Sequence, residues 1–153
     1  DARPLEVRWS RMNCSMTSFK ASDSVTERVR VLVVEDFTDA REMYVEYLTM
    51  KGYDVIGAED GLAALEVARA LIPDVIVLDI GLPKLSGFAV LRKLKAGVDT
   101  RGIDVITLSA SAGTAYRDEA MEAGAAMALE KPCTPDELHE AISAFTNGAE
   151  QTG

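Results

Sequence analysis

Two kinds of hydrophobic pattern alternate along this chain. Val75–Leu78 is an unbroken aliphatic run, mostly β-branched, which is typical of a strand buried on both faces. Comparable runs lie at 29–34, 53–58, 103–108 and 125–130, the one at 53–58 being the weakest. Between them, apolar residues recur every three or four positions, as on one face of a helix. The pattern predicts five strands alternating with five helices.

Local signals mark where the helices begin. The first helix has an apolar stripe and can be capped by Thr38; the stripe comprises Ala40, Met43, Tyr44, Tyr47 and Leu48. Asp60-Gly61 and Ser86-Gly87 open the second and third helices. A fourth is expected at about 115–123. Thr134-Pro135-Asp136-Glu137 is a capping box for the last one, which is expected to fray after Asn147-Gly148.

This alternation predicts the α/β class: a five-stranded parallel sheet with helices on both faces. The flavodoxin-like strand order 2-1-3-4-5 is the expected topology. We expect the folded domain to span 28–147 and a tail to follow at 148–153. Residues 1–27 are rich in Ser and Thr and predict a flexible arm or leader, although apolar residues at helical spacing leave a partner-binding helix open.

Composition narrows the functions. The 153 residues fit one domain, and 48% apolar with 27% charged residues is ordinary for a globular protein. A net charge of −9 argues against a nucleic-acid partner, which needs clustered basic residues. Cys14 and Cys133 lack metal-ligand spacing and are interpreted as small packing residues. No apolar run predicts membrane insertion or a signal peptide, so a cytoplasmic protein is expected. The lone histidine, His139, is expected to face solvent.

The candidate chemistry lies at the carboxyl ends of the predicted strands. Strand 1 is followed by Glu35 and Asp36, strand 3 ends at Asp79, strand 4 leads into Ser109 and strand 5 into Lys131. In the order 2-1-3-4-5 these strands are neighbours, so the five side chains should line one cleft. Open α/β sheets bind their ligands at this edge.

Any one of these residues could be an ordinary cap or loop residue, but three acids together are harder to explain without a cation. Two carboxylates about 4 Å apart repel by roughly 4 kcal/mol at an effective dielectric of 20. Oxygen ligands select a hard divalent ion such as Mg²⁺. Carboxylates, Mg²⁺, a lysine and a hydroxyl together are suited to phosphoryl transfer.

The motifs Glu35-Asp36, Asp79 with Pro83 and Gly87, Leu108-Ser109-Ala110 and Lys131-Pro132 resemble the receiver domain of bacterial response regulators. Each motif is weak alone, but their order and strand placement make the combination specific. The resemblance covers about 28–147. It implies a phosphoacceptor domain of a two-component phosphorelay, whose partner is a histidine kinase or histidine phosphotransfer protein.

Residue by residue, the resemblance implies that Asp79 accepts the phosphoryl group. Asp36, Asp79 and the carbonyl of Gly81 would bind Mg²⁺ directly, and Glu35 would act partly through water. Ser109 and Lys131 would each bind a phosphate oxygen, and the Lys131–Pro132 bond is expected to be cis. Such a domain phosphorylates and dephosphorylates itself and is not a turnover enzyme. Many receivers carry Tyr or Phe three residues before the lysine, where this chain has Ala128, so signalling is expected to run through backbone shifts around 109–111 in place of an aromatic relay.

Other interpretations stay open. The chain could be a receiver excised from a larger regulator or hybrid kinase, or a receiver-like module that docks constitutively without phosphorylation. A phosphatase of the haloacid-dehalogenase type would need a second acid two residues after its nucleophile, and Gly81 stands there. A nucleotide-binding protein would need a glycine-rich loop after strand 1, where Glu35-Asp36-Phe37 is acidic instead.

Overall fold

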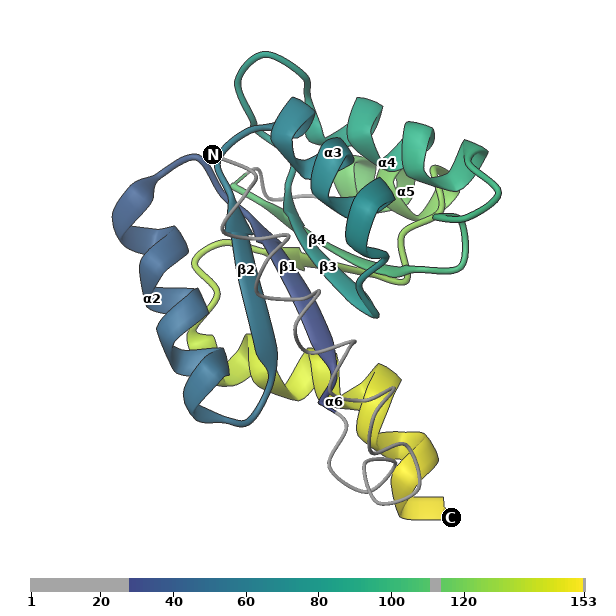
Figure 1. Cartoon of the computed structure of the whole chain (residues 1–153). Coiled ribbons are helices and arrows are strands. Elements are labelled where there is room, and N and C mark those ends of the chain that lie inside the picture. The colour runs from purple at the N-terminus through teal and green to yellow at the C-terminus, as the bar shows by residue number, and fades with distance from the viewer. Residues whose placement is uncertain (1–27, 111–113, 153) are drawn as a thin grey trace.

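The computed structural model describes residues 28–110 and 114–152, and for residues 114 and 147–152 it describes the backbone alone (Figure 1). The arm predicted at 1–27, including Cys14, lies outside the described residues. No helix in the described part of the chain combines the length and the apolar character needed to cross a bilayer.

The five predicted strands are present and all pair in parallel, in the order β2-β1-β3-β4-β5, which confirms the predicted fold class. Their bounds are β1 Arg30–Val34, β2 Asp54–Ala58, β3 Val75–Asp79, β4 Asp104–Ser109 and β5 Met127–Glu130. β3 begins with its apolar run at Val75, and the other four strands begin one or two residues later than theirs. The weak run at 53–58 does form a strand, at the edge of the sheet beside β1.

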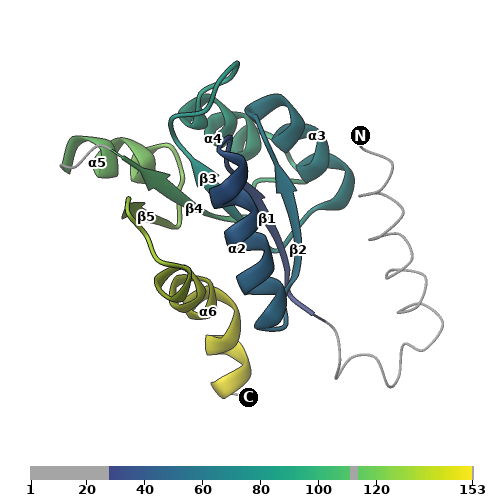
Figure 2. The same cartoon turned by 90° about the vertical axis from the view of Figure 1, so that its left-hand side faces the viewer.

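Helices cover both faces of the sheet, α2 and α6 on one and α3, α4 and α5 on the other (Figures 1 and 2). Their bounds are α2 Thr38–Met50, α3 Gly61–Leu71, α4 Gly87–Ala96, α5 Thr114–Glu122 and α6 Pro135–Thr152. Alternate residues of β1 point to opposite faces: Leu32 and Val34 join the core under α3 and α4, whereas Val31 and Val33 join the core under α2 and α6. Strands β1 to β4 are therefore mostly buried on both faces, as their apolar runs predict, whereas β5 at the edge of the sheet is only half-buried and ends at the exposed Glu130.

Most of the predicted helix starts are confirmed by side-chain caps. Asp60 Oδ1 accepts a hydrogen bond from the Ala63 amide (2.8 Å), and Ser86 Oγ accepts one from Ala89 (3.2 Å). In the capping box, the Glu137 amide donates to Thr134 Oγ1 (3.1 Å), and the Thr134 amide donates to Glu137 Oε1 (3.0 Å). These bonds satisfy amide groups that the first turn of a helix leaves free.

Three sequence predictions are wrong in detail. Thr38 is the first helical residue of α2 and not its cap; the cap position is Phe37, with no side-chain cap bond. Met43 is predicted to belong to the apolar stripe but is 44% exposed; in α2 the buried residues are Tyr44 and Leu48. The backbone of α6 also stays helical past Asn147-Gly148, to Thr152.

His139 does not simply face solvent. Its Nδ1 shares a hydrogen bond of 3.0 Å with the hydroxyl of Tyr53, and the two rings meet edge to face at 5.5 Å. The side chain is half-buried between α6 and the start of β2. Cys133 is buried, as the packing interpretation expects, and burial raises the pKa of its thiol.

Candidate functional site

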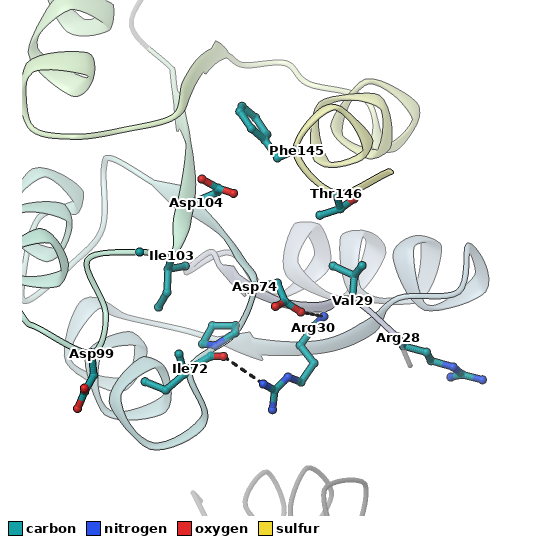
Figure 3. A pocket seen from close by; sticks show the side chains of 12 residues that line it. Arg28, Val29, Arg30, Ile72, Asp74, Asp99, Ile103, Asp104, Phe145 and Thr146 are labelled. Carbon is teal, nitrogen blue, oxygen red and sulfur yellow. Dashed lines mark hydrogen bonds between the residues drawn. The ribbon is translucent and has the colours of Figure 1, made fainter. Parts of the chain in front are cut away.

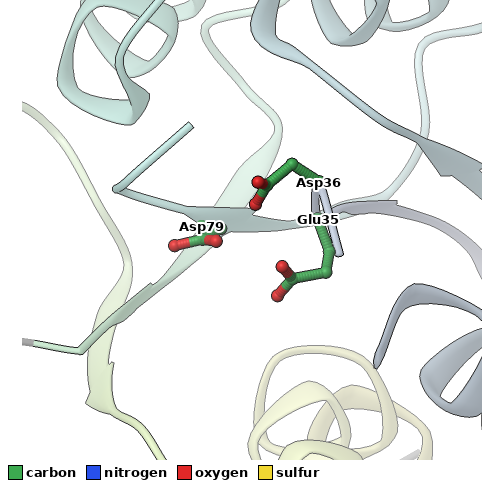
Figure 4. Close-up of side chains that lie close together, drawn as sticks. All are labelled: Glu35, Asp36 and Asp79. Atoms are coloured by element: carbon green, nitrogen blue, oxygen red, sulfur yellow. The ribbon is translucent and has the colours of Figure 1, made fainter. Parts of the chain in front are cut away.

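Three carboxylates meet where β1 and β3 end. In the parallel pairing of β1 with β3, Val31 lies opposite Val75 and Val34 lies opposite Leu78. The residues that follow β1 therefore lie beside the last residue of β3. One carboxylate oxygen from each of Glu35, Asp36 and Asp79 lies within 4.8 Å of the others (Figure 4). The clustering of acids predicted from the strand order is therefore present.

These acids differ in exposure, and one cation lies between two of them. Glu35 is 2% exposed and Asp79 5%, whereas Asp36 is exposed. Lys131 Nζ, at the end of β5, lies 2.9 Å from Glu35 Oε1 and 3.2 Å from Asp79 Oδ2. One positive charge thus lies beside two buried carboxylates, and the carboxylate of Asp36 lies next to them. The Lys131–Pro132 bond is cis, as the resemblance implies.

The titration of this group reflects its burial. Burial raises the pKa of Glu35, against the hydrogen bonds from Lys131 and the Phe37 amide, and the charge of Asp79 raises it further. Burial on its own would lower the pKa of Lys131, but the hydrogen bond to Glu35 and the charges of Asp79 and Glu35 outweigh it, so the pKa is raised. The site therefore keeps its lysine protonated and disfavours the ionised form of Glu35.

Backbone groups fix the directions of the two buried acids. The Gly81 amide donates to Asp79 Oδ1 at 3.0 Å, and the Phe37 amide donates to Glu35 Oε2 at 3.1 Å. Gly87 lets the start of α4 approach Asp79 closely: a Cβ there would lie 2.5 Å from both the Asp79 carbonyl oxygen and Ile80 Cα. Only glycine permits this approach without a shift of the backbone.

Asp79 and Lys131 line one cleft of about 620 Å³ together with Ser109. The Lys131 amide donates to the Ser109 carbonyl oxygen at 2.8 Å, which ties the ends of β4 and β5 together. Gly81 lines the same cleft. All six residues predicted from the sequence, Glu35, Asp36, Asp79, Gly81, Ser109 and Lys131, therefore lie at this edge of the sheet.

A larger hollow of about 720 Å³ lies at the opposite edge, where the strands begin (Figure 3). Its lining includes Arg30, whose amide donates to Asp74 Oδ2 at 2.9 Å and whose guanidinium donates to the Ile72 carbonyl oxygen at 3.4 Å. Size alone would favour this hollow as the functional site. The arrangement of charge favours the carboxyl edge, because there two buried carboxylates, Glu35 and Asp79, share one lysine.

The carboxylate cluster has the ligand chemistry of a hard divalent cation. Bonds of about 2.0–2.1 Å would place opposite ligands of Mg²⁺ roughly 4.2 Å apart. The separation of up to 4.8 Å is a few tenths of an ångström longer, so one carboxylate must move inward or act through a water molecule. The donor set fits Mg²⁺, which keeps part of its water shell in proteins.

Sequence reasoning missed some residues around the cleft. Phe88 and Tyr116 stand in no sequence motif, yet both line the cleft, and their rings are stacked with centroids 6.2 Å apart and planes at 16°. Tyr44 is buried, as its place in the apolar stripe predicts. Its hydroxyl also donates a hydrogen bond of 2.7 Å to the carbonyl oxygen of Cys133, which lies two residues after Lys131. Burial raises the pKa of Tyr44 to about 12. Helical periodicity placed Tyr44 correctly but could not reveal its hydrogen-bond partner.

Comparison with known proteins gives a consistent result. A family model described as the response regulator receiver domain matches residues 31–143. The response regulator PleD of Caulobacter vibrioides is 37% identical over 117 residues, which is 76% of this chain and 26% of PleD. The curated relatives extend well beyond the match, since the chain spans between 26% and 50% of their lengths.

Solved structures show the same likeness. A CheY-like receiver domain protein from Methanospirillum hungatei superposes with a TM-score of 0.75 at 25% identity, covering 83% of this chain and 100% of that one. The receiver domain of a histidine kinase from Syntrophus aciditrophicus gives a TM-score of 0.72 at 28% identity, covering 82% of this chain and 95% of that one.

Proposed function

This chain belongs to the response regulator receiver domain family of two-component signalling, and from that premise we propose that it accepts a phosphoryl group on Asp79. The donor would be a phosphohistidine of a histidine kinase or histidine phosphotransfer protein, and Mg²⁺ would be bound at Glu35, Asp36, Asp79 and the Gly81 carbonyl. The product would be an aspartyl phosphate that changes which protein the domain binds.

The observation that carries this proposal is the position of Lys131 between Glu35 and Asp79, beside the exposed Asp36. Helix-capping or surface acids do not need such an arrangement. Burying two carboxylates against one lysine costs folding free energy. The cost is understandable if the site exists to bind a cation and then a phosphoryl group.

Asp79, Lys131 and Ser109 would have different roles in the transfer of the phosphoryl group. Asp79 is held by the Gly81 amide on Oδ1, which leaves Oδ2, the oxygen now beside Lys131, to attack phosphorus. Lys131 would then transfer its hydrogen bond from the carboxylate to a phosphoryl oxygen, and Ser109 would donate its hydroxyl to another. Bound Mg²⁺ supplies charge neutralisation for the carboxylates and the incoming phosphoryl oxygens.

Phosphorylation would act as a switch because it adds about −1.5 to −2 charges and three acceptor oxygens at the edge of the sheet. Only a conformer in which Ser109 and Lys131 are drawn towards Asp79 donates hydrogen bonds to these phosphoryl oxygens. Two or three charge-assisted hydrogen bonds of roughly 1.5–3 kcal/mol each could supply the ~3–5 kcal/mol that a swing from mostly inactive to mostly active needs. The binding partner downstream would be a protein, in line with the net charge of −9.

The central test is incubation of the chain with acetyl phosphate and Mg²⁺, followed by intact mass measurement. We expect the parent protein to gain the mass of one phosphoryl group and Asp79→Asn to gain none. The matched control is Asp74→Asn, which alters a carboxylate at the start of the same strand, outside the site, and should be phosphorylated like the parent. EDTA should prevent the gain.

If the parent gains no mass, the receiver-like docking module becomes the better interpretation. If Asp79→Asn still gains a phosphoryl group, the modified residue lies elsewhere and the assignment of Asp79 is wrong.

A further inference from the structure

Two aromatic rings form part of the wall of the cleft beside Asp79. Phe88 comes from the first turn of α4 and Tyr116 from the first turn of α5, and both line the cleft that Asp79, Ser109 and Lys131 also line. The rings are nearly parallel, at 16°, with centroids 6.2 Å apart. Phe88 is half-buried, and Tyr116 is 42% exposed.

This aromatic wall, Phe88 with Tyr116, is supported from the side. The guanidinium carbon of Arg92 lies 5.8 Å from the Phe88 centroid, within the range of a cation–π contact. Arg92 Nη2 also lies 3.2 Å from Glu119 Oε2, so α4 and α5 are joined by an ion pair next to the rings. Arg92 therefore contacts the Phe88 ring and α5 together, and a contact that restrains a ring before a ligand arrives lowers the entropy cost of binding against it.

The cleft is larger than the transferred group requires. Its volume of about 620 Å³ falls within the roughly 300–1,000 Å³ typical of pockets for small molecules. A phosphoryl group bound to Asp79 and Lys131 would fill only part of it. The group to which the phosphoryl is attached in the donor therefore has room against the aromatic wall.

Resting on the proposed function, the geometry points to a role for this wall in selecting the phosphodonor. The Phe88 and Tyr116 rings stack against the flat imidazole ring of a phosphohistidine donor and make it a better substrate than a donor with an acyl leaving group. Aromatic side chains favour flat aromatic partners in offset-stacked or edge-to-face contacts, and the acetate of acetyl phosphate offers no such surface. Phe88 and Tyr116 are thus specificity-determining residues.

The transfer balances without any further reactant. The P–N bond of the donor breaks, and a P–O bond forms between phosphorus and the Asp79 carboxylate. The electron pair of the broken bond returns to the ring nitrogen, and the ring leaves as neutral imidazole when its other nitrogen carries a proton. The wall contacts the ring and not phosphorus, so its effect should depend on the leaving group.

The test compares two small phosphodonors, phosphoimidazole and acetyl phosphate, by following the gain of mass with time in the presence of Mg²⁺. In Phe88→Leu and Tyr116→Leu, which keep apolar bulk but lose the ring, we expect the ratio of the phosphoimidazole rate to the acetyl phosphate rate to fall about three- to tenfold. Tyr116→Phe keeps the ring and should keep the ratio. Met121→Ala, on the exposed part of α5 and outside the cleft, should keep both rates.

Equal loss of both rates in the leucine variants would mean that the rings only support the fold, and an unchanged ratio would mean that they do not contact the donor; either result overturns this inference. A parent that accepts acetyl phosphate but not phosphoimidazole also overturns it and leaves the proposed function standing. A parent that accepts neither donor overturns both. Circular dichroism melting curves of the leucine variants identify any variant that has unfolded. If Phe88→Leu has unfolded, the rate ratio is measured in Phe88→Tyr instead, which keeps the ring. A fall of the ratio in Phe88→Tyr counts against the inference.

Discussion

The two edges of the sheet both carry charged side chains around a hollow, but they balance charge in different ways. At the amino edge, Asp74 and Asp99 are exposed, and Asp74 accepts a backbone hydrogen bond from Arg30. At the carboxyl edge, Glu35 and Asp79 are buried and share one lysine, Lys131. The larger hollow belongs to the amino edge, and the pair of buried carboxylates that share one lysine belongs to the carboxyl edge.

The difference teaches that buried charge, and not cavity size, indicates where chemistry occurs. An exposed carboxylate costs little, because water screens it. A buried carboxylate must be paired, and the net cost of burying it is seldom recovered in stability. A fold that retains such a group has a use for it. Five substitutions would test how far the two edges differ.

The largest effect is expected at Lys131. Lys131→Met removes the cation between Glu35 and Asp79 and leaves both buried carboxylates without a positive charge beside them, so in EDTA we expect the free energy of unfolding to fall by about 3 kcal/mol. This is at the low end for buried pairs, because the lysine side chain is 28% exposed. Urea denaturation monitored by circular dichroism measures it.

The matched substitution at the amino edge is Asp99→Asn, for which the expected change is below about 0.5 kcal/mol, because the side chain is exposed. If the two variants lost the same free energy of unfolding, the two edges would not differ in the way described here.

A second pair compares glycines. In Gly87→Ala the new methyl group would lie 2.5 Å from the Asp79 carbonyl oxygen and must push α4 away from β3, at a cost of about 2 kcal/mol. In Gly102→Ala, beside the hollow at the amino edge, nothing lies within 4 Å of the new Cβ, so the change should stay within about 0.5 kcal/mol. Thermal melts of both variants compare them directly. A harmless Gly87→Ala would show that α4 does not pack closely enough to hold Asp79 in position.

The smallest effect concerns pH. Because burial raises the folded-state pKa of Glu35 above its ordinary 4.5, the folded protein binds more protons than the unfolded chain between those two pKa values. The contribution of Glu35 to stability therefore falls as pH rises through that window. In EDTA, Glu35→Gln should remove this slope from the urea midpoints measured as the pH rises from 4.5 to 7. A steeper slope in the variant would give the opposite sign and contradict the cause assigned.

The sequence predicted the fold well because its signals are local. Unbroken aliphatic runs identified the strands, and the Thr134–Glu137 capping box located the start of α6. Where local signals compete, prediction was wrong: Thr38 could cap a helix, but Phe37 occupies the cap position of α2. Met43 fitted a helical stripe, but the stripe is wider than the surface that α2 buries.

The placement of the site was predictable for a similar reason. Once Glu35, Asp36, Asp79, Ser109 and Lys131 are assigned to strand ends, a parallel sheet of known order brings them to one edge. Their roles in binding Mg²⁺ and accepting phosphate are still predictions that the experiments above address. The aromatic wall was not predictable, because Phe88 and Tyr116 belong to different helices and neither stands in a recognisable motif.

By itself, the sequence determined the order of strands and helices and the set of reactive side chains, because both depend on periodicity and on residue type at given positions. The tertiary structure decided which side chains touch. It placed Lys131 between two acids and paired Tyr53 with His139, 86 positions apart. Such contacts depend on how the helices pack on the sheet and on side-chain rotamers, and these are fixed only when the whole core is assembled.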